Sequence, residues 1–508
     1  MEQQEIAGDR SPNAQGVLLV VCAALFFGVL NASAVGVILP EIATDLSIGP
    51  GQLSWLMTGF LLVYAIAIPL YGRLADLYGA KVLFLVGVGV FAAGSLMSAV
   101  ADNYSILLAS RIVQAVGGAA VPGLGMTLAS RAYGPEARGK ILGVVAATIG
   151  VGGAVGPLWG GVLSQSFGWQ SVFVVNAAAV LAIPLGIKLL TADENRAGGS
   201  LDWLGGLALA LLVGGAMLIP AEGARSGWSS SLVIAGAASV VIGLAVLSAR
   251  ELMADSPFIP KEFFRNSRYV ALVWMSFSVM AANLAPLIGL PILLSTIHRL
   301  SPLEVGLVLL PSAVSTSVAG IVAGRITDRR GARLPIWGGS PLMLIAVLGL
   351  STYSGASVWA ISIFAGILGA GFGLVNTPLA ATVSRIVRVQ MLALALSINS
   401  MLFFLGGSLG TALLIAVVTV RGEGTARPFN PLHFGAGTGF SDAFLLLSLP
   451  VLAVMALSLA LPKTQVQGTA PESTSLRTPV SETWVANCSV PWMPVCQEFD
   501  QQEPCESV

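Results

Sequence analysis

Apolar runs of about twenty residues recur along almost the whole chain. A helix of that length, rising 1.5 Å per residue, crosses the ~30 Å hydrocarbon layer of a membrane. Lipid offers backbone N–H and C=O groups no partner, and the alternating pattern of a membrane β-strand is absent, so each run is predicted to be a helix. The runs give fourteen predicted spans, at 16–40, 53–71, 82–100, 105–129, 140–163, 171–190, 203–221, 230–249, 270–296, 304–324, 335–352, 357–383, 391–419 and 441–461.

The composition agrees with a protein whose surface faces lipid. Hydrophobic residues make up 55% of the 508 residues and charged residues only 10%, whereas a soluble domain carries about 25% charged residues. The fold class is therefore an all-α integral membrane protein. An enzyme is not expected: both histidines, His298 and His433, fall in predicted loops, and no nucleophile, metal or phosphate-loop constellation occurs. We expect no cofactor and no metal.

The placement of basic residues predicts the orientation in the membrane. With the N-terminus in the cytoplasm, twenty of the 25 Lys and Arg residues fall on the cytoplasmic side, four fall outside and Arg111 lies within a span. Cytoplasmic loops are rich in Lys and Arg, so both termini are predicted to be cytoplasmic, in a multi-pass protein of the plasma membrane. The net charge of +0 gives no reason to expect nucleic-acid binding. We expect a monomer.

The spans and the composition between them predict six segments. They are a cytoplasmic N-terminus at 1–15, a six-helix half at 16–190, two extra central helices at 191–250, a cytoplasmic linker at 251–269, a second six-helix half at 270–461 and a tail at 462–508. The tail is rich in Pro, Ser, Thr and Glu and is predicted to be disordered and cytoplasmic.

A loop motif occurs twice, after predicted spans 2 and 10. The two copies agree at Gly, Arg, Asp, Gly and Ala, and Lys in the first is matched by Arg in the second. This repeat predicts two halves of related fold. The copies run Gly72-Arg73-Leu74-Ala75-Asp76-Leu77-Tyr78-Gly79-Ala80-Lys81 and Gly324-Arg325-Ile326-Thr327-Asp328-Arg329-Arg330-Gly331-Ala332-Arg333.

At these loops the chain resembles the major facilitator superfamily, whose halves each carry such a loop after their second helix. The resemblance implies two six-helix halves, here with two additional central helices. It also implies that the acid stabilises one conformation by capping a helix and pairing with a cation. Asp76 is then expected at the start of the helix near residue 391, with Arg385 or Arg388 close by.

Predicted span 4 contains Arg111-Ile112-Val113-Gln114-Ala115-Val116-Gly117-Gly118, which resembles a pattern of the fourteen-helix drug:proton antiporter branch of that superfamily. Arg111, Gln114 and Gly118 share one helix face. A buried charge costs at least ~2.5 kcal/mol even on insertion scales, so Arg111 should face a cavity or a partner. The candidate residues for binding substrate or for coupling are Arg111, Gln114, Asn31, Asn283, Asn376 and Asn399, each of which could instead be an interhelical contact.

Predicted span 5 contains Gly152-Gly153-Ala154-Val155-Gly156-Pro157-Leu158-Trp159-Gly160-Gly161, which resembles the signature of exporters in that branch. The glycines at every fourth position form a stripe that admits a close partner helix, and Pro157 is expected to bend the helix. The motif residues are Gly152, Gly156, Pro157, Gly160 and Gly161.

The whole pattern looks most like the Gram-positive tetracycline efflux proteins, with one departure. Those exporters resemble this chain but carry acids where Ala32, Gly153 and Gly407 stand here, and other members carry one where Asn31 stands. None of the 25 Asp and Glu residues lies in the middle of a predicted span.

Two functions fit this sequence. The first is a secondary active exporter of amphipathic small molecules, such as drugs or antibiotics, driven by the proton motive force through alternating access. The second is a facilitator or importer of a polar or anionic metabolite, with Arg111 as the partner of the anion. The expected partners are a small-molecule substrate, the lipid bilayer and protons.

Overall fold

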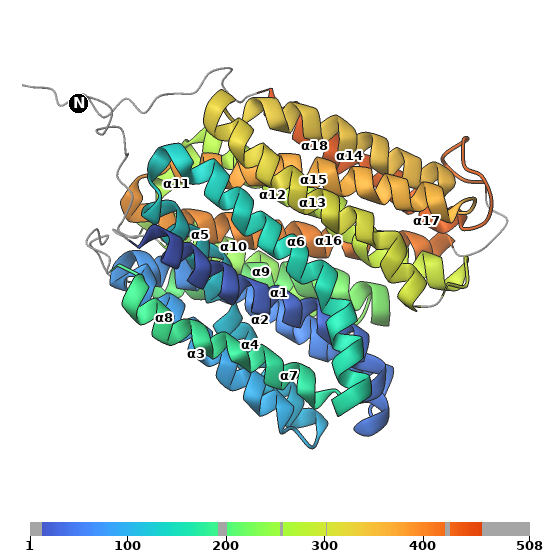
Figure 1. The fold of residues 1–508 in the computed structure, drawn as a ribbon, viewed down its shortest axis with the longest axis horizontal. Coiled ribbons are helices and arrows are strands. Elements are labelled where there is room, and N and C mark those ends of the chain that lie inside the picture. The colour runs from blue at the N-terminus through green and yellow to red at the C-terminus, as the bar shows by residue number, and fades with distance from the viewer. Residues whose placement is uncertain (1–12, 192–200, 254–257, 301, 422–426, 460–508) are drawn as a thin grey trace, which may run out of the picture. The chain divides into compact units, whose positions relative to one another are not determined.

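The computed structural model describes residues 13–191, 201–253, 258–300, 302–421 and 427–459. All regular elements in these ranges are helices (Figure 1). In chain order they are α1 (Ala14–Asp45), α2 (Pro50–Tyr78), α3 (Ala80–Ala99), α4 (Tyr104–Gly118), α5 (Ala120–Ala132), α6 (Gly134–Phe167), α7 (Gln170–Ala177), η1 (Ala178–Leu181), α8 (Ala182–Leu189), α9 (Trp203–Ser226), α10 (Ser231–Met253), α11 (Lys261–Arg265), α12 (Ser267–Thr296), α13 (Pro302–Arg330), α14 (Arg333–Tyr353), α15 (Val358–Ile386), η2 (Val389–Met391), α16 (Leu392–Arg421), α17 (Thr438–Leu446) and α18 (Ser448–Ser458).

These helices confirm the predicted fold class. By length and composition they provide 13 candidate membrane spans, or 14 when the two arms of α6 count as one. The arms of α6, Ala137–Gly153 and Leu158–Phe167, differ in direction by 42°. The predicted tail at 462–508 and most of the N-terminal segment lie outside the described residues.

The helices form two groups. In the N-terminal group, α1 to α8, α1 packs along α6 and α3 packs along α4 and α7. In the C-terminal group, α12 to α18, α12 packs along α16 and α15 packs along α13 and α14. Buried aliphatic and aromatic side chains fill the interior of each group.

The pair α9 and α10 lies outside both groups. The two helices pack along each other, and Gly243 of α10 lets the backbone approach Ala208 and Leu212 of α9. Helix α9 also contacts α2 of one group and α16 of the other. It therefore covers the line along which these two helices meet.

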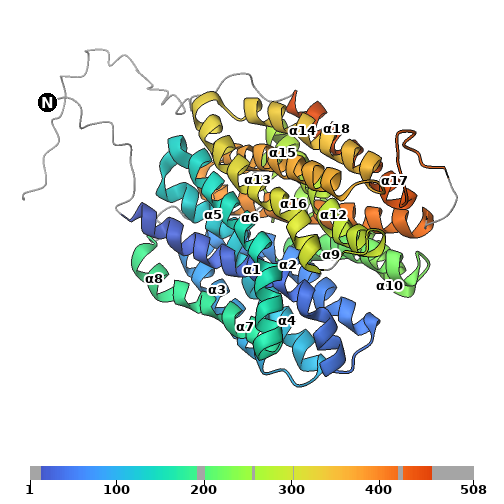
Figure 2. The same cartoon turned by 45° about the vertical axis from the view of Figure 1, so that its right-hand side comes forward.

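The two groups touch through a few helices. Helix α6 packs against α13 and α15, and α2 and α5 pack against α16; Figures 1 and 2 both show α6 beside α13. Glycines bring the backbones together, since a Cβ added at Gly143 would lie 2.8 Å from the carbonyl oxygen of Gly320. We call the end of the bundle that bears Asp76 and Asp328 the motif end.

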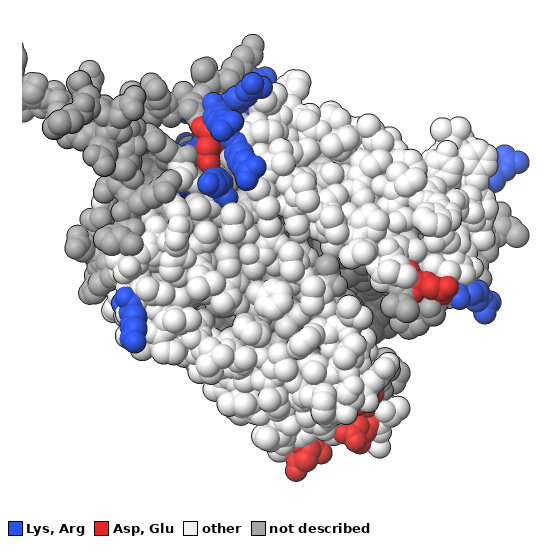
Figure 3. Space-filling view, viewed as in Figure 1, with Lys and Arg blue, Asp and Glu red and all other residues white. Residues whose placement is uncertain are grey.

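The opposite end is more open. Helix α1 packs mainly on α6 within the N-terminal group, and α12 packs mainly on α16 within the C-terminal group. Figure 3 shows the surface hollowed between the two groups on the side away from the motif end. The described part of the chain is thus closed between the groups at the motif end and hollowed at the other.

Candidate functional site

Asp76, at the end of α2, binds the start of α16. Its Oδ1 accepts the N–H of Ala393 at 3.1 Å and its Oδ2 accepts the N–H of Leu394 at 3.0 Å. The first N–H groups of a helix have no partner within it, and the helix dipole favours an anion there. The carboxylate is 1% exposed. This confirms the expected contact between Asp76 and the helix that follows residue 391.

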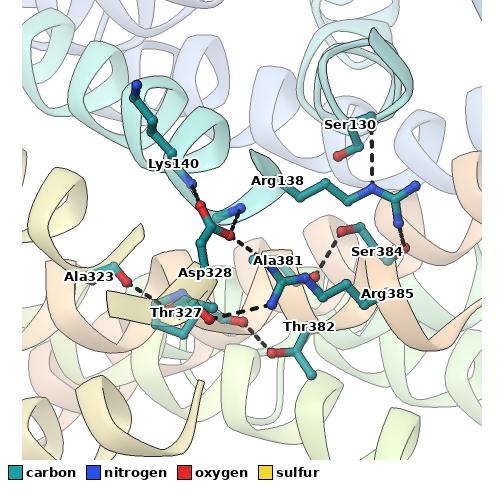
Figure 4. Close-up of polar contacts among 12 residues, drawn as sticks. Ser130, Arg138, Lys140, Ala323, Thr327, Asp328, Ala381, Thr382, Ser384 and Arg385 are labelled. Atoms are coloured by element: carbon teal, nitrogen blue, oxygen red, sulfur yellow. Dashed lines mark hydrogen bonds and ion pairs between the residues drawn. The ribbon is translucent and has the colours of Figure 1, made fainter. Parts of the chain in front are cut away.

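Asp328, in the second copy of the motif, makes the reciprocal contact from α13. It accepts the N–H of Gly139 at 2.8 Å and the N–H of Lys140 at 2.7 Å, both near the start of α6. Arg385, at the end of α15, forms an ion pair with it at 2.5 Å (Figure 4). Each copy of the repeated motif therefore joins one group of helices to the other.

The cations expected beside Asp76 lie elsewhere. Arg385 pairs with Asp328, and Arg388 pairs with Glu262. The positive charges that act on Asp76 belong to Arg131 and Arg73. The physical reason is the repeat itself: Arg131 lies at the end of α5 as Arg385 lies at the end of α15, so each arginine acts on the acid of its own group of helices.

Two arginines of the N-terminal group also bind carbonyl oxygens across the interface. Arg138 donates to Ser384 at 2.5 Å across the interface and to Ser130 at 3.3 Å within its own group, and Arg131 donates to Val389 at 3.2 Å across the interface. Sequence reasoning missed Arg138. Its place at the start of a long apolar run, next to the predicted loop, was the available signal.

The glycines of the motif allow a turn and a close approach. Gly79 and Gly331 have φ of 105° and 82°, in the left-handed region that favours glycine. A Cβ at Gly72 would lie 2.9 Å from the carbonyl oxygen of Ala393, and a Cβ at Gly324 would collide with the backbone of Gly139. The glycines thus permit the contacts that the two acids make.

The basic residues of the motif have separate surroundings. Arg73 is buried beside Asp76 and Asp202. Lys81 donates to the carbonyl oxygens of Ile187 and Leu190 at 3.0 and 2.5 Å, and so ties α3 to the end of α8. In the second copy, Arg325 is exposed and Arg333 lies over the ring of Trp337.

Arg111 lies inside the N-terminal group, surrounded by amides. It donates to Gln114, to Oδ1 of Asn31 at 3.4 Å and to the carbonyl oxygen of Leu56 at 3.5 Å. Gln114 donates in turn to Asn31 at 3.2 Å and to Ser95 at 2.7 Å. Arg111 is 1% exposed, and Asn31 and Gln114 are 0% exposed. In this structure these three candidate residues do not reach the hollow.

The buried cluster leaves the charge of Arg111 without an anion. Among the described residues no Asp or Glu forms an ion pair with it, and its Nη2 atom has no hydrogen-bond partner there. Its guanidinium instead lies 4.1 Å from the ring centre of Phe60. Asn176 of α7, which sequence reasoning missed, donates to Asn31 at 3.1 Å; as a polar residue inside an apolar run it was detectable.

The three remaining polar candidates lie in the C-terminal group. Asn399 accepts a hydrogen bond from Ser276 at 2.7 Å and is buried between α12 and α16. Asn283 of α12 and Asn376 of α15 are partly exposed. The six candidates therefore form no single cluster: three gather around Arg111, one pairs with Ser276 and two remain partly open.

The glycine stripe of predicted span 5 packs on α1. A Cβ at Gly152 would meet Val29 and Phe26 at 3.2 to 3.3 Å, one at Gly160 would meet Ala34 at 3.0 Å, and Gly156 lies against Ser33. Gly161 faces open space instead. The side chain of Pro157 lies outside the described residues, although the bend in α6 falls between Gly153 and Leu158.

One ion pair joins the two helices of the extra pair to each other. Arg250 of α10 donates to Asp202, the N-cap of α9, at 3.0 Å, and Asp202 also accepts the N–H of Gly205 at 3.0 Å. Burial of Asp202 opposes its ionisation, but these hydrogen bonds outweigh burial and hold the pKa of the carboxyl below its usual value. Because Asp202 also acts on Arg73, α9 is electrostatically linked to the first motif.

Comparison with known families gives one match that spans most of the chain. The family described as Major Facilitator Superfamily matches residues 21–411. Among curated relatives, the riboflavin transporter RibZ of Clostridioides difficile is 28% identical over 367 residues, which cover 71% of this chain and 79% of that protein. The multidrug resistance protein Stp of Mycobacterium tuberculosis is 28% identical over 408 residues, covering 80% and 76%.

Two further similarities agree with this match. The multidrug transporter protein MdtP of Bacillus subtilis is 26% identical over 401 residues, covering 78% of this chain and 74% of that protein. The crystal structure of the human organic anion transporter MFSD10 (TETRAN) superposes with a TM-score of 0.64 at 16% identity, covering 88% of this chain and 100% of that one. At 16% identity, the similarity to MFSD10 concerns the fold alone.

Proposed function

This chain belongs to the major facilitator superfamily, and we propose that it is a secondary active exporter of amphipathic small molecules, such as drugs or antibiotics, driven by the proton motive force. It is a multi-span membrane transporter and not an enzyme. The single observation that supports the mechanism is the pair of contacts at the motif end, opposite a hollowed far end, in which Asp76 and Asp328 accept backbone N–H groups from the other group of helices. Such an arrangement is one end state of an alternating-access cycle.

Export is favoured by relatives and by the packing of α6. Stp and MdtP are named as multidrug proteins, and the close contact of α1 with α6 rests on the glycine stripe that resembles the exporter signature. The proposed cycle moves the α6–α13 and α2–α16 contacts apart at the motif end while the far end closes.

A second candidate function is a facilitator or importer of a polar or anionic metabolite. The observation that favours it is the unpaired positive charge of Arg111 inside the N-terminal group. RibZ, at similar identity, is named as a riboflavin transporter. Net efflux of substrate from loaded proteoliposomes separates the two, because a facilitator releases substrate without moving protons, whereas a strictly coupled exporter must take protons in and acidifies the lumen.

Proton coupling is proposed to use an acid at the edge of the membrane, because the sequence has no acid in the middle of a span. The five candidates are Asp76, Asp202, Glu222, Asp328 and Asp442. Asp202, Asp328 and Asp442 have arginine partners in Arg250, Arg385 and Arg421, whereas the hydrogen bonds that Asp76 accepts come from backbone N–H groups. Protonating Asp76 would weaken those bonds and loosen the motif end.

The orientation in the membrane is also a proposal. Basic residues gather at the motif end (Figure 3), and cytoplasmic loops are rich in them. We place this end and both termini in the cytoplasm, in the plasma membrane, with the protein acting as a monomer. The conformation with a closed motif end is then the outward-facing one.

Inverted membrane vesicles test the proposal. Substrate should accumulate in them against its gradient when protons are pumped inward, and nigericin, which collapses the pH gradient, should abolish this accumulation. Valinomycin, which removes the membrane potential and leaves the pH gradient, shows how much of the accumulation depends on the potential instead. Replacing each of the five acids in turn by its amide should identify the coupling residue. Uphill transport that depends on the pH gradient yet survives all five replacements would contradict the coupling proposal.

A further inference from the structure

Aromatic side chains form a row that crosses the interface between the two groups of helices. Phe60 stacks on Tyr64 within α2, with ring centres 5.6 Å apart, and Tyr64 meets Phe404 of α16 edge to face at 5.3 Å. Phe404 contacts Phe403 at 5.5 Å, and Phe403 contacts Phe372 of α15 at 6.2 Å. We call these five residues the aromatic row.

The row lies at the middle of the membrane. Tyr64 precedes Asp76 by 12 positions, and Phe404 follows Leu392, the first residue of α16, by 12 positions. At 1.5 Å per residue both rings are roughly 18 Å from the motif end, in a hydrocarbon layer of about 30 Å. Between the rings and the motif end, Gly72 packs against Ser397 and closes the interface. The row is therefore just beyond the closed section.

Tyr64 points toward the interior and not toward lipid. Leu62 and Ile66 occupy the face of α2 that contacts Gly214 of α9, and Tyr64 lies between them in sequence, about 200° around the helix from each. Its ring lies against Gly118 of α4. Tyr64, Phe403 and Phe404 are each partly exposed.

The charge behind the row is positive. The guanidinium of Arg111 covers one face of Phe60, at 4.1 Å from the ring centre, and its hydrogen-bond partners are neutral oxygens. Its Nη2 atom is buried without a partner among the described residues. An arginine stays protonated, and in a medium of low dielectric its field reaches beyond one ring layer.

We propose that the aromatic row is a ligand site for planar aromatic compounds that are neutral or anionic, in preference to lipophilic cations. Offset or edge-to-face stacking on Tyr64 and Phe404 would hold a planar ring system, and the uncompensated charge of Arg111 would favour a negative group. This inference rests on the proposed function, since it names the class of compound carried. The absence of acids in the middle of the spans agrees with this preference, because the site then has no anionic partner for a cationic ligand.

Binding to the purified full-length protein in lipid nanodiscs tests the site, with fluorescein as the planar anion and ethidium as the planar cation at pH 8. Fluorescence anisotropy should give a Kd for fluorescein about tenfold below that for ethidium. Tyr64→Leu and Phe404→Leu should each weaken fluorescein binding roughly three- to tenfold. The matched control is Tyr353→Leu, which removes a ring stacked on Phe364 away from the row and should leave Kd unchanged.

Two arginine variants separate charge from packing. Arg111→Gln should abolish the preference for fluorescein, and Arg111→Lys, which keeps the charge, should retain it. Gel filtration and melting show whether Arg111→Gln folds. If it does not fold, the proposal is judged by the preference of the wild type for fluorescein over ethidium and by the binding of Tyr64→Leu and Phe404→Leu. Equal or tighter binding of ethidium by the wild type, or ring variants indistinguishable from Tyr353→Leu, would overturn the site.

The outcomes also separate this inference from the proposed function. Loss of uphill export in vesicles together with the expected binding pattern would refute the exporter and leave the site intact. Uphill export of ethidium that is unaffected by Tyr64→Leu and Phe404→Leu would refute the site and leave the exporter intact.

Discussion

The two copies of the loop motif make the same kind of contact between the two groups of helices, but in different surroundings. Asp76 binds the N–H groups of Ala393 and Leu394, directly after α16 begins at Leu392. Asp328 binds Gly139 and Lys140, more than a turn into α6. The side chain of Asp328 is 14% exposed and paired with Arg385, whereas Asp76 is 1% exposed.

This difference teaches that one motif can stabilise an interface in two ways. Around Asp76 the closure depends on a helix cap at the first residues of α16. Helix α9 is electrostatically linked to this motif through Asp202 and Arg73. Around Asp328 the closure depends on two backbone N–H groups within α6 and on a charge pair that solvent partly screens. We therefore expect the closure at the motif end to depend more on Asp76 than on Asp328.

The largest effect is expected from Asp76→Ala, which leaves the N–H groups of Ala393 and Leu394 buried without an acceptor. A buried unsatisfied donor costs about 1–3 kcal/mol, enough to shift the population toward a form open at the motif end by roughly 5- to 150-fold. Ser397→Cys reports this opening, because Ser397 packs against Gly72 and Gly123 of the other group. Maleimide labelling, with the four native cysteines replaced by serine, should accelerate strongly in Asp76→Ala and less in Asp328→Ala. Equal acceleration of labelling in Asp76→Ala and Asp328→Ala would contradict the expected greater role of Asp76 in closure.

A second large effect is expected from Gly324→Ala, because its Cβ would collide with the backbone of Gly139. Backbone cannot yield as a flexible side chain does, so α6 and α13 should be held apart at the motif end. We expect transport to fall about tenfold or more, equivalent to roughly 1.4 kcal/mol, with faster labelling of Ser397→Cys. Gly338→Ala is the matched control, since its Cβ would meet nothing within 4 Å, and its transport should be unchanged.

Arg385→Gln should have an intermediate effect, confined to the second motif. The Arg385 side chain is 22% exposed, so solvent discounts the ion pair with Asp328 to about 1 kcal/mol or less, or up to roughly fivefold in the closed population. Raising the salt concentration should weaken the wild-type contact and leave the variant unaffected. A double-mutant cycle with Asp328→Asn measures the coupling energy, and a value near zero would show that the pair contributes nothing to closure.

The smallest effect is expected from Arg250→Gln, which frees Asp202 at the start of α9. Arg250 is 35% exposed, so the pair should contribute less than about 1 kcal/mol. The folded-state pKa of Asp202 is lowered, so its contribution is present above the unfolded pKa of about 3.9 and lost as pH falls through the folded value. The melting temperature of the variant should therefore be slightly lower than wild type at pH 7 and equal to it at low pH. An equal difference at both pH values would argue against Asp202 as the cause.

The sequence alone determined the parts that depend on depth and on local pattern. Length and hydropathy of each run predict a spanning helix because every residue adds 1.5 Å. The repeat at Gly72 and Gly324 revealed two related sets of helices, and the stripe at Gly152, Gly156 and Gly160 marked a close helix contact. The contact of Asp76 with the helix after residue 391 came from the family resemblance.

Only the tertiary structure decided which groups meet. A run of apolar residues fixes how deep a side chain lies but not which way a helix is rotated, because the lipid-facing and the packed faces of a spanning helix are both largely apolar. The sequence thus left open whether Arg111, Asn31 and Gln114 line a cavity, and packing turned them into one buried network. The pairing of Arg385 with Asp328 and the contact of Tyr64 with Phe404 likewise join residues far apart in the chain. Such contacts depend on the relative placement of whole helices, which no local pattern encodes.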